Sequence, residues 1–124
     1  MGMQRTVRFD SGGVPSWDAV RSQLGRLGLA VAVKMIDGLP AFPDEVPEAG
    51  WKELRVGTPN GMVTLRADSG SMTCVVWGNA GDALHADWDA LCWACAAAGA
   101  GRVESADGSH DADEFERLTG LRPA

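Results

Sequence analysis

The fold is decided by residues 51–77, WKELRVGTPNGMVTLRADSGSMTCVVW, in which three short runs of strand-forming residues alternate with turn sequences. The runs cover 51–56, 62–67 and 71–77. The stretches between them, GTPNG and DSGS, carry the Asn-Gly and Ser-Gly pairs that are typical of tight turns. Three strands joined by turns this short predict an antiparallel meander.

The register of the first hairpin follows from charge. A four-residue loop at 58–61 places Glu53 opposite Arg66. A two-residue loop at 60–61 would instead place Arg55 opposite Arg66, and like charges directly across a strand pair destabilise it. We therefore expect the longer loop. This register leaves one side of the meander, the outer face, facing away from the helices, and that face carries Trp51, Glu53, Arg55, Met62, Thr64, Arg66, Thr73, Val75 and Trp77.

The residues before the meander predict a strand, a helix and a second strand. Polar and apolar residues alternate along 5–9, which predicts a strand. This strand would bury Val7 and Phe9 and add Arg8 to the outer face. A helix starts after Pro15 and Ser16 and ends near Gly28, and the apolar run 29–36 suits a central strand. This order favours a right-handed crossover between two parallel strands.

The residues after the meander predict a helix, a short strand and a terminal helix. The first helix covers 83–98, the strand 102–105, a turn 107–110, and the second helix about 111–119 with Gly120 as its stop. The whole chain then predicts an α+β fold. Its single sheet is mixed but mostly antiparallel, built as β-α-β, a three-strand meander and α-β-α, with the helices packed mainly on one face.

Composition predicts one globular domain over residues 1–124, because a chain of this length with 45% hydrophobic residues can bury a core without disulfides or metal. The stretch 37–50 contains three Pro and four acidic residues, so we expect a long surface loop. Through Phe42 and Val46 this loop could fold over the outer face as a lid.

The charge balance and the cysteines indicate the class of protein. Eleven basic against seventeen acidic side chains give a net charge of −6, which argues against nucleic-acid binding and favours a basic partner. No apolar run reaches membrane-spanning length and no secretory signal is present, so we expect a cytoplasmic protein without a membrane partner. Three cysteines in such a chain are expected to be reduced.

The chemistry-bearing residues have two interpretations. Cys92 and Cys95 have the spacing of a redox motif, but they fall on the buried stripe of a helix, which favours core packing. His85, Asp89 and Cys92 also share one flank of that helix and could bind a metal ion. The acidic stretch 107–114 lacks the residue order of an EF-hand and is explained by a helix N-terminus.

These observations favour a small interaction module without catalytic activity, cofactor or metal. Trp and Arg dominate binding surfaces, so the outer face is the first candidate. Trp93 lies on an apolar back of its helix, which we expect to be covered either by another element of the same chain, such as the terminal helix, or by a second molecule. The module would bind a protein, such as the basic toxin of an immunity protein, or form a homodimer. The alternatives are a metal or thiol enzyme using His85, Asp89 and Cys92, or a small-ligand protein with Trp51 and Trp77 beneath the 37–50 loop. The predicted partner-binding residues are Trp51, Arg55, Arg66, Trp77 and Trp93.

Overall fold

A computed structural model describes residues 2–10, 13–43, 45–78, 80–106 and 108–124. Within them the chain forms eight strands and three helices. The strands are β1 (Met3–Arg8), β2 (Ala32–Ile36), β3 (Leu39–Pro40), β4 (Glu53–Thr58), β5 (Gly61–Ala67), β6 (Ser71–Val76), β7 (Arg102–Ser105) and β8 (Gly108–Asp111). The helices are α1 (Trp17–Arg26), α2 (Asp82–Gly99) and α3 (Ala112–Thr119). None of these described helices combines the length and apolarity that crossing a membrane requires.

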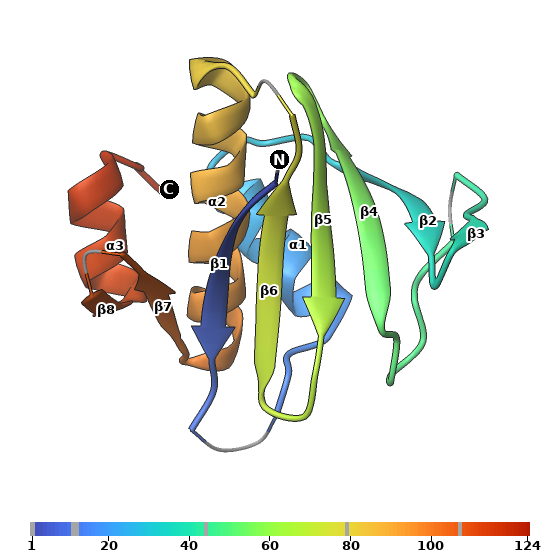
Figure 1. The fold of residues 1–124 in the computed structure, drawn as a ribbon, viewed down its shortest axis with the longest axis horizontal. Coiled ribbons are helices and arrows are strands. Elements are labelled where there is room, and N and C mark those ends of the chain that lie inside the picture. Colours follow the sequence, from blue (N-terminus) through green and yellow to red (C-terminus); the bar gives the residue numbers. More distant parts are fainter. Residues whose placement is uncertain (1, 11–12, 44, 79, 107) are drawn as a thin grey trace.

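The described strands form one open sheet in the order β3-β2-β4-β5-β6-β1-β7-β8 (Figure 1). This confirms an α+β fold, but every pairing between the described strands is antiparallel, so the predicted mixed sheet is wrong. The first two long strands, β1 and β2, do run in the same direction, yet β4, β5 and β6 lie between them. A local strand-helix-strand pattern shows the direction of two strands but not which strands become neighbours.

The meander forms β4, β5 and β6 at the centre of the sheet. Glu53 lies opposite Arg66, which confirms the register that avoids facing two arginines. The ladder continues until Thr58 faces Gly61, so the four residues of the predicted loop make a turn in which only the middle two are unpaired. The two faces of the sheet are therefore fixed as the charge argument predicted.

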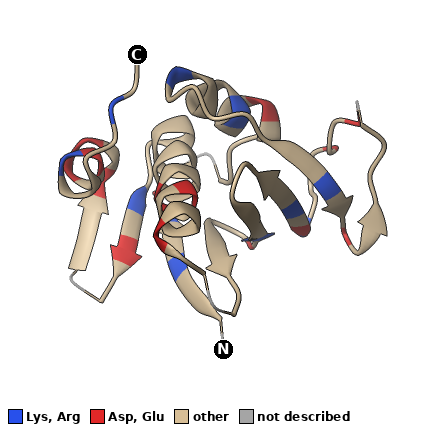
Figure 2. Cartoon of the chain, turned by 90° about the horizontal axis from the view of Figure 1, so that it is seen from above, with Lys and Arg blue, Asp and Glu red and all other residues tan. Residues whose placement is uncertain are grey.

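The long helix α2 lies at the centre of the core. It contacts β1, β5, β6 and β7, while α1 and α3 each pack against α2. Figure 1 shows α1 and α2 behind the strands, and Figure 2 shows the same arrangement from above. The indole N–H of Trp88 donates a hydrogen bond to the carbonyl of Cys74 at 3.0 Å, which joins α2 directly to β6. Seven consecutive residues of α2, 90–96, are buried, so this helix is enclosed by the rest of the chain.

The helix boundaries follow the predicted capping signals. Ser16 caps α1, and Asp111 caps α3 in a reciprocal capping box with Glu114. Gly28 and Gly120 follow α1 and α3 in the left-handed conformation, which glycine adopts without strain. These local interactions explain why the ends of the helices can be read from the sequence.

Two short strands at the edges differ from the predicted turn and loop. The predicted turn at 107–110 forms strand β8 instead, which pairs with β7; Asp107 lies outside the described residues. The predicted loop 37–50 starts with β3, which pairs with β2, and Asp44 in that loop is also outside the described residues. Both strands are formed by pairing with a neighbour rather than by their own residue preferences, which is why composition did not reveal them.

Gly101 lies where the end of β1 comes close to the start of β7. A Cβ atom at this position would lie 2.7 Å from the backbone carbonyl oxygen of Arg8, which cannot move without breaking the sheet. We expect Gly101→Ala to lower the free energy of unfolding by about 1–3 kcal/mol, measured by urea denaturation.

Gly25 provides the matched control for this substitution. It lies inside α1, and an added Cβ would meet nothing within 4 Å. Gly25→Ala is therefore expected to raise the free energy of unfolding by about 0.5–1 kcal/mol, because alanine loses less backbone entropy in a helix. Equal effects of the two substitutions would show that the close approach at Gly101 is absent.

Candidate functional site

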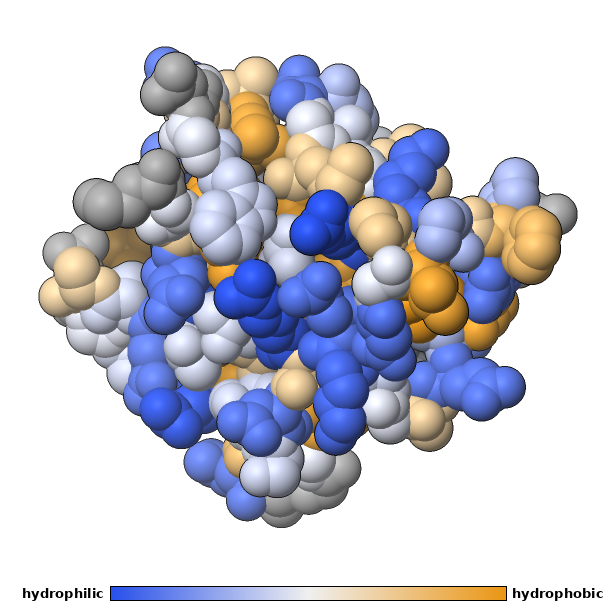
Figure 3. All heavy atoms as spheres, turned by 45° about the vertical axis from the view of Figure 1, so that its right-hand side comes forward, coloured by the Kyte–Doolittle hydropathy of each residue, from blue (hydrophilic) through white to orange (hydrophobic). Residues whose placement is uncertain are grey.

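The outer face is the side of the sheet opposite α2. Along β5, Thr64 and Arg66 point to this face and alternate with Val63 and Leu65, which are buried in the core. Figure 3 turns this face and the β2–β3 edge toward the viewer, and strongly hydrophilic side chains gather near its centre with small apolar patches beside them. The residues predicted for partner binding that lie here are Arg55, Arg66 and Trp77.

Trp77 is the most prominent side chain of the outer face. It is 54% exposed, but its position is fixed by neighbours on several sides. Its indole N–H donates a long hydrogen bond to the hydroxyl of Thr64 at 3.4 Å, and the guanidinium of Arg66 lies 5.6 Å from the centre of its ring. A Cβ at Gly2 would lie 2.9 Å from the same ring, so the indole packs closely over the N-terminal backbone. A large aromatic side chain is thus exposed and already ordered.

The charged groups on β2, β4 and β5 of the outer face are mainly positive. Glu53 accepts a hydrogen bond from Arg66 at 3.1 Å and lies 4.0 Å from Arg55, so one carboxylate faces two guanidinium groups. Lys34 sits at a bulge in β2 and lies against Gly57, where an added Cβ would be 2.9 Å from its Cε. Exposed ion pairs add little stability, so these groups are available to a partner.

The outer face contains a shallow depression of about 260 Å³, which is lined by Arg55, Met62, Thr64 and Trp77. Met62 is also exposed, so the depression combines apolar and cationic walls. The sequence placed Met62 on this face but could not show that its side chain would border a hollow. The cation of Lys34 could not be placed either, because a β-bulge leaves no clear signal in a single sequence.

Trp51 does not lie on the outer face, which corrects the prediction from strand alternation. It is only 7% exposed and belongs to the core, together with Trp17 of α1. The strand β4 begins after it, at Glu53, because the carboxylate of Asp37 accepts hydrogen bonds from the backbone amides of Lys52 at 2.7 Å and Glu53 at 2.9 Å. The chain bends at this anchor, so strand alternation does not extend to Trp51.

Trp93 is also unavailable as a partner-binding residue. It is 2% exposed, and the guanidinium of Arg26 on α1 lies 5.6 Å from its ring. Another element of the same chain therefore covers the apolar back of α2, which was one of the two alternatives, but near Trp93 that element is α1 rather than the terminal helix. The sequence correctly indicated that this side of α2 is apolar, but helical periodicity could not identify the covering element.

The described part of the 37–50 loop does not form a lid over the outer face. Phe42 is 79% exposed and Val46 is also exposed, so neither is buried against the sheet. Pro43 and Glu45 instead border a depression that is shared with Trp17 and Arg21 of α1. The lid interpretation is wrong because the loop runs beside α1, on the helical side of the protein.

The proposed metal ligands are already engaged in packing or pairing. Asp89 forms an ion pair and hydrogen bond with Arg5, and Cys92 is fully buried. The ring of His85 packs edge-on against Trp88, with centroids 5.6 Å apart. Within the described ranges, no group of three or more His, Cys, Asp or Glu side chains is arranged to hold a metal ion. In the acidic stretch after Asp107, Asp111 acts as the helix cap of α3.

All three cysteines are buried free thiols in the core. Burial raises the pKa of the Cys92 thiol well above its ordinary value, and the neighbouring Cys74 thiol raises it further. The pKa of Cys74 is also raised well above its ordinary value, since contact with Cys95 and burial outweigh the opposing hydrogen bond with Cys92. Neutral, enclosed thiols are poor nucleophiles, so this arrangement suits packing.

These thiols predict a pH dependence of stability. Below about pH 8.5 the thiols of Cys74 and Cys92 are protonated in both states, and above it these two thiols ionise in the unfolded state but not in the folded one, where their pKa is raised. The free energy of unfolding should therefore fall above that pH, by up to about 1.4 kcal/mol per pH unit for each thiol. The measurement is urea denaturation from pH 7 to 10, with Cys92→Ala as the variant that should show a smaller slope.

Reaction with a thiol reagent tests the same arrangement independently. We expect none of the three cysteines to react with Ellman's reagent in the folded protein and all three to react in urea. Rapid reaction of one thiol in the native state would contradict a purely structural role for the cluster.

Of the outer face and the core thiols, only the first is open to a protein partner. Arg55, Arg66 and Trp77 are brought together, whereas Trp51 and Trp93 are buried in the core. No protein-family model, curated protein or solved structure matches this chain.

Proposed function

We propose that this protein is a small interaction module without catalytic activity, and that it binds a protein partner through Arg55, Arg66 and Trp77 on the outer face. The observation that carries the proposal is the ordered exposure of Trp77, which is 54% exposed and held by Thr64 and Arg66. Aromatic and arginine side chains supply most hot spots in interfaces, and an ordered side chain loses less entropy on binding.

The charge of this face favours a partner with acidic groups. Near Trp77, the guanidinium groups of Arg55 and Arg66 face the carboxylate of Glu53, and Lys34 adds a further cation over Gly57 on the same face of the sheet. Electrostatic attraction at a contact is set by charges within a Debye length of about 8 Å, so these groups outweigh the net charge of −6 carried by the whole chain. A basic partner, such as the toxin bound by an immunity protein, would match the net charge but not this face.

Self-association is the second candidate for the same face. Two copies meeting through identical surfaces would bring the Arg55 and Arg66 groups of each copy near those of the other. Like charges across an interface cost binding energy unless the surfaces are offset, so a different, acidic protein fits better.

Retention of a partner by surface variants tests the proposal. Tagged protein carrying Arg66→Glu and Trp77→Ala is compared with a matched control carrying Arg117→Glu and Phe42→Ala, which removes an arginine and an exposed aromatic away from the outer face. Partners recovered from the native cells are quantified by mass spectrometry. We expect a partner that the wild type and the control both retain to be lost at least about tenfold in the outer-face variant.

Two results would contradict this proposal. Equal retention by both variants would place the partner on another surface. A concentration-dependent dimer in sedimentation velocity that disappears only in the outer-face variant would show that the occupant is a second copy.

A further inference from the structure

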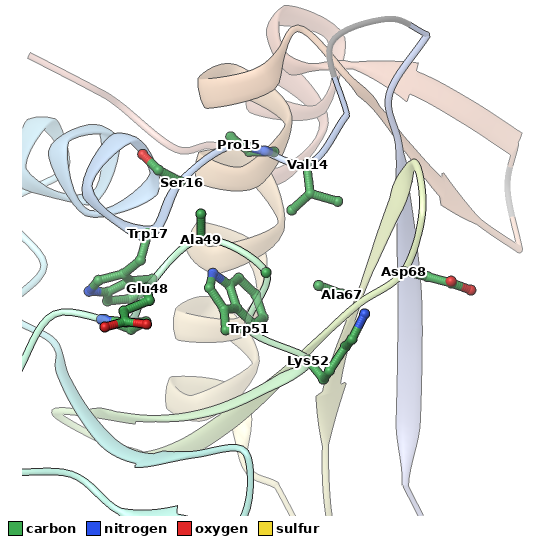
Figure 4. A pocket seen from close by; sticks show the side chains of 12 residues that line it. Val14, Pro15, Ser16, Trp17, Glu48, Ala49, Trp51, Lys52, Ala67 and Asp68 are labelled. Atoms are coloured by element: carbon green, nitrogen blue, oxygen red, sulfur yellow. The ribbon is translucent and has the colours of Figure 1, made fainter.

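A pocket separate from the outer face lies where the 37–50 loop returns to the sheet. It has a volume of about 250 Å³ and is bordered by the start of α1, residues 47–52 and the end of β5 (Figure 4). Trp51 and Trp17 both line it, from the strand side and the helix side, although only the small exposed parts of the two core indoles, 7% and 4%, reach the pocket. Sequence alternation had paired Trp51 with Trp77 beneath the loop, whereas the structure brings Trp51 together with Trp17.

The walls of the pocket combine apolar and polar groups. Val14 and Pro15 precede α1, and Ala67 ends β5, so small apolar groups face the two indoles. A cavity of about 150 Å³ with apolar walls is enough to hold a benzene ring. At about 250 Å³ this pocket has room for one aromatic ring with a small substituent. The ring would be recognised by contact with the indoles, since aromatic pairs add binding energy beyond the area they bury.

The charged side chains at the rim of the pocket differ in whether they already have a hydrogen-bond or ion-pair partner. Figure 4 shows Lys52 rising between Trp51 and Asp68, and Glu48 lying on the other side near Trp17. The carboxylate of Asp68 accepts a hydrogen bond from the amide of Ser69 at 2.8 Å and points away from Trp51 in this view. Among the described residues, Lys52 has no ion-pair partner within 4.0 Å. A ligand ring lying against Trp51 would thus place a substituent next to the ammonium group of Lys52, which also interacts electrostatically with the carboxylate of Asp37.

We propose that this pocket binds a small aromatic carboxylate, with its ring against Trp51 and Trp17 and its carboxylate paired with the ammonium of Lys52. Glu48 at the opposite end repels a carboxylate and so fixes the direction in which the ligand lies. A charge-assisted hydrogen bond between ammonium and carboxylate supplies the specificity for acids over neutral rings. This site does not depend on the outer face and would add ligand binding to the interaction module.

Sodium benzoate is the probe for this proposal, followed by the indole N–H signals of the protein in two-dimensional NMR. The signals of Trp17, Trp51 and Trp77 are assigned from single Trp→Phe variants. We expect benzoate to shift the signals of Trp17 and Trp51 saturably while that of Trp77 stays in place. Because Trp77 reports on the outer face, this readout separates the pocket from the proposed partner surface.

Charge reversal at the rim tests the role of Lys52. The variant Lys52→Glu should weaken benzoate binding by about fivefold to tenfold, whereas Lys34→Glu, which reverses a lysine on the outer face, should leave it unchanged. Benzylamine, which has the same ring and the opposite charge, should bind the wild type more weakly than benzoate does.

Three outcomes would overturn the proposal. The first is the absence of a saturable shift at Trp17 and Trp51, and the second is benzylamine binding as tightly as benzoate. The third is an equal loss of affinity in both lysine variants, which would show only a general effect of charge. None of these outcomes would bear on partner binding by the outer face.

Discussion

Replacing Trp93 by alanine is expected to lower the free energy of unfolding by about 3–5 kcal/mol, as measured by urea denaturation. The reason is its burial between α1 and α2, where it is 2% exposed and the guanidinium of Arg26 lies over its ring. Removing a side chain of this size leaves a cavity that two packed helices cannot close. The loss of stability should occur without any change in the oligomeric state.

Trp77→Ala is the matched control, because it removes the same side chain from the outer face. Trp77 is exposed, so we expect a cost below about 1 kcal/mol. The pair of variants separates a structural tryptophan from one that is available for binding. If Trp93→Ala kept its stability but dissociated a dimer, Trp93 would be an interface residue and the packing of α1 on α2 would be wrong.

The second large effect is expected at the ion pair between Arg5 and Asp89. The guanidinium of Arg5 lies 3.9 Å from the centre of the Trp88 ring and 5.4 Å from that of Phe115, so it is enclosed by aromatic groups on α2 and α3. Asp89→Ala removes the carboxylate that compensates this enclosed cation. We expect a loss of about 3 kcal/mol, since an uncompensated charge in a partly buried site is costly.

The double variant Arg5→Met with Asp89→Leu distinguishes this cause from a general disturbance of α2. Replacing both charges with apolar side chains removes the uncompensated cation, so the double variant should be more stable than Asp89→Ala alone. Unfolding by urea at low and high salt adds a second readout, because a partly buried pair is screened less than a surface pair. A double variant that is less stable than Asp89→Ala would contradict the pairing.

Much of the fold could be predicted because local rules determine it. The register of the first hairpin follows from keeping Arg55 away from Arg66, and the ends of α1 and α3 follow from their caps and glycines. The neighbours of β1 could not be predicted in this way. β1 pairs with β6 and β7, which lie far away in the sequence, and this choice depends on how α2 packs across the sheet.

The candidate site was predicted in part for the same reason. Arg55, Arg66 and Trp77 share a face because strand alternation holds along regular strands. Trp51 was misplaced because Asp37 anchors the chain just before β4 and ends the alternation. Trp93 was misjudged because helical periodicity identifies an apolar side but not the element that covers it. The pocket beside Trp17 depends on three segments that meet only in the folded protein, so no pattern in the sequence could reveal it.

The most direct test of the proposed binding face is site-specific photo-crosslinking in the native cells. A photoreactive amino acid replaces Met62, at the edge of the depression beside Trp77, or Leu118, an exposed residue of α3 that serves as control. We predict a discrete protein adduct from position 62 but not from position 118, and its loss when Arg66→Glu is added. An adduct from position 118 alone, no adduct from position 62, or an adduct at 62 that persists with Arg66→Glu would contradict binding through the outer face.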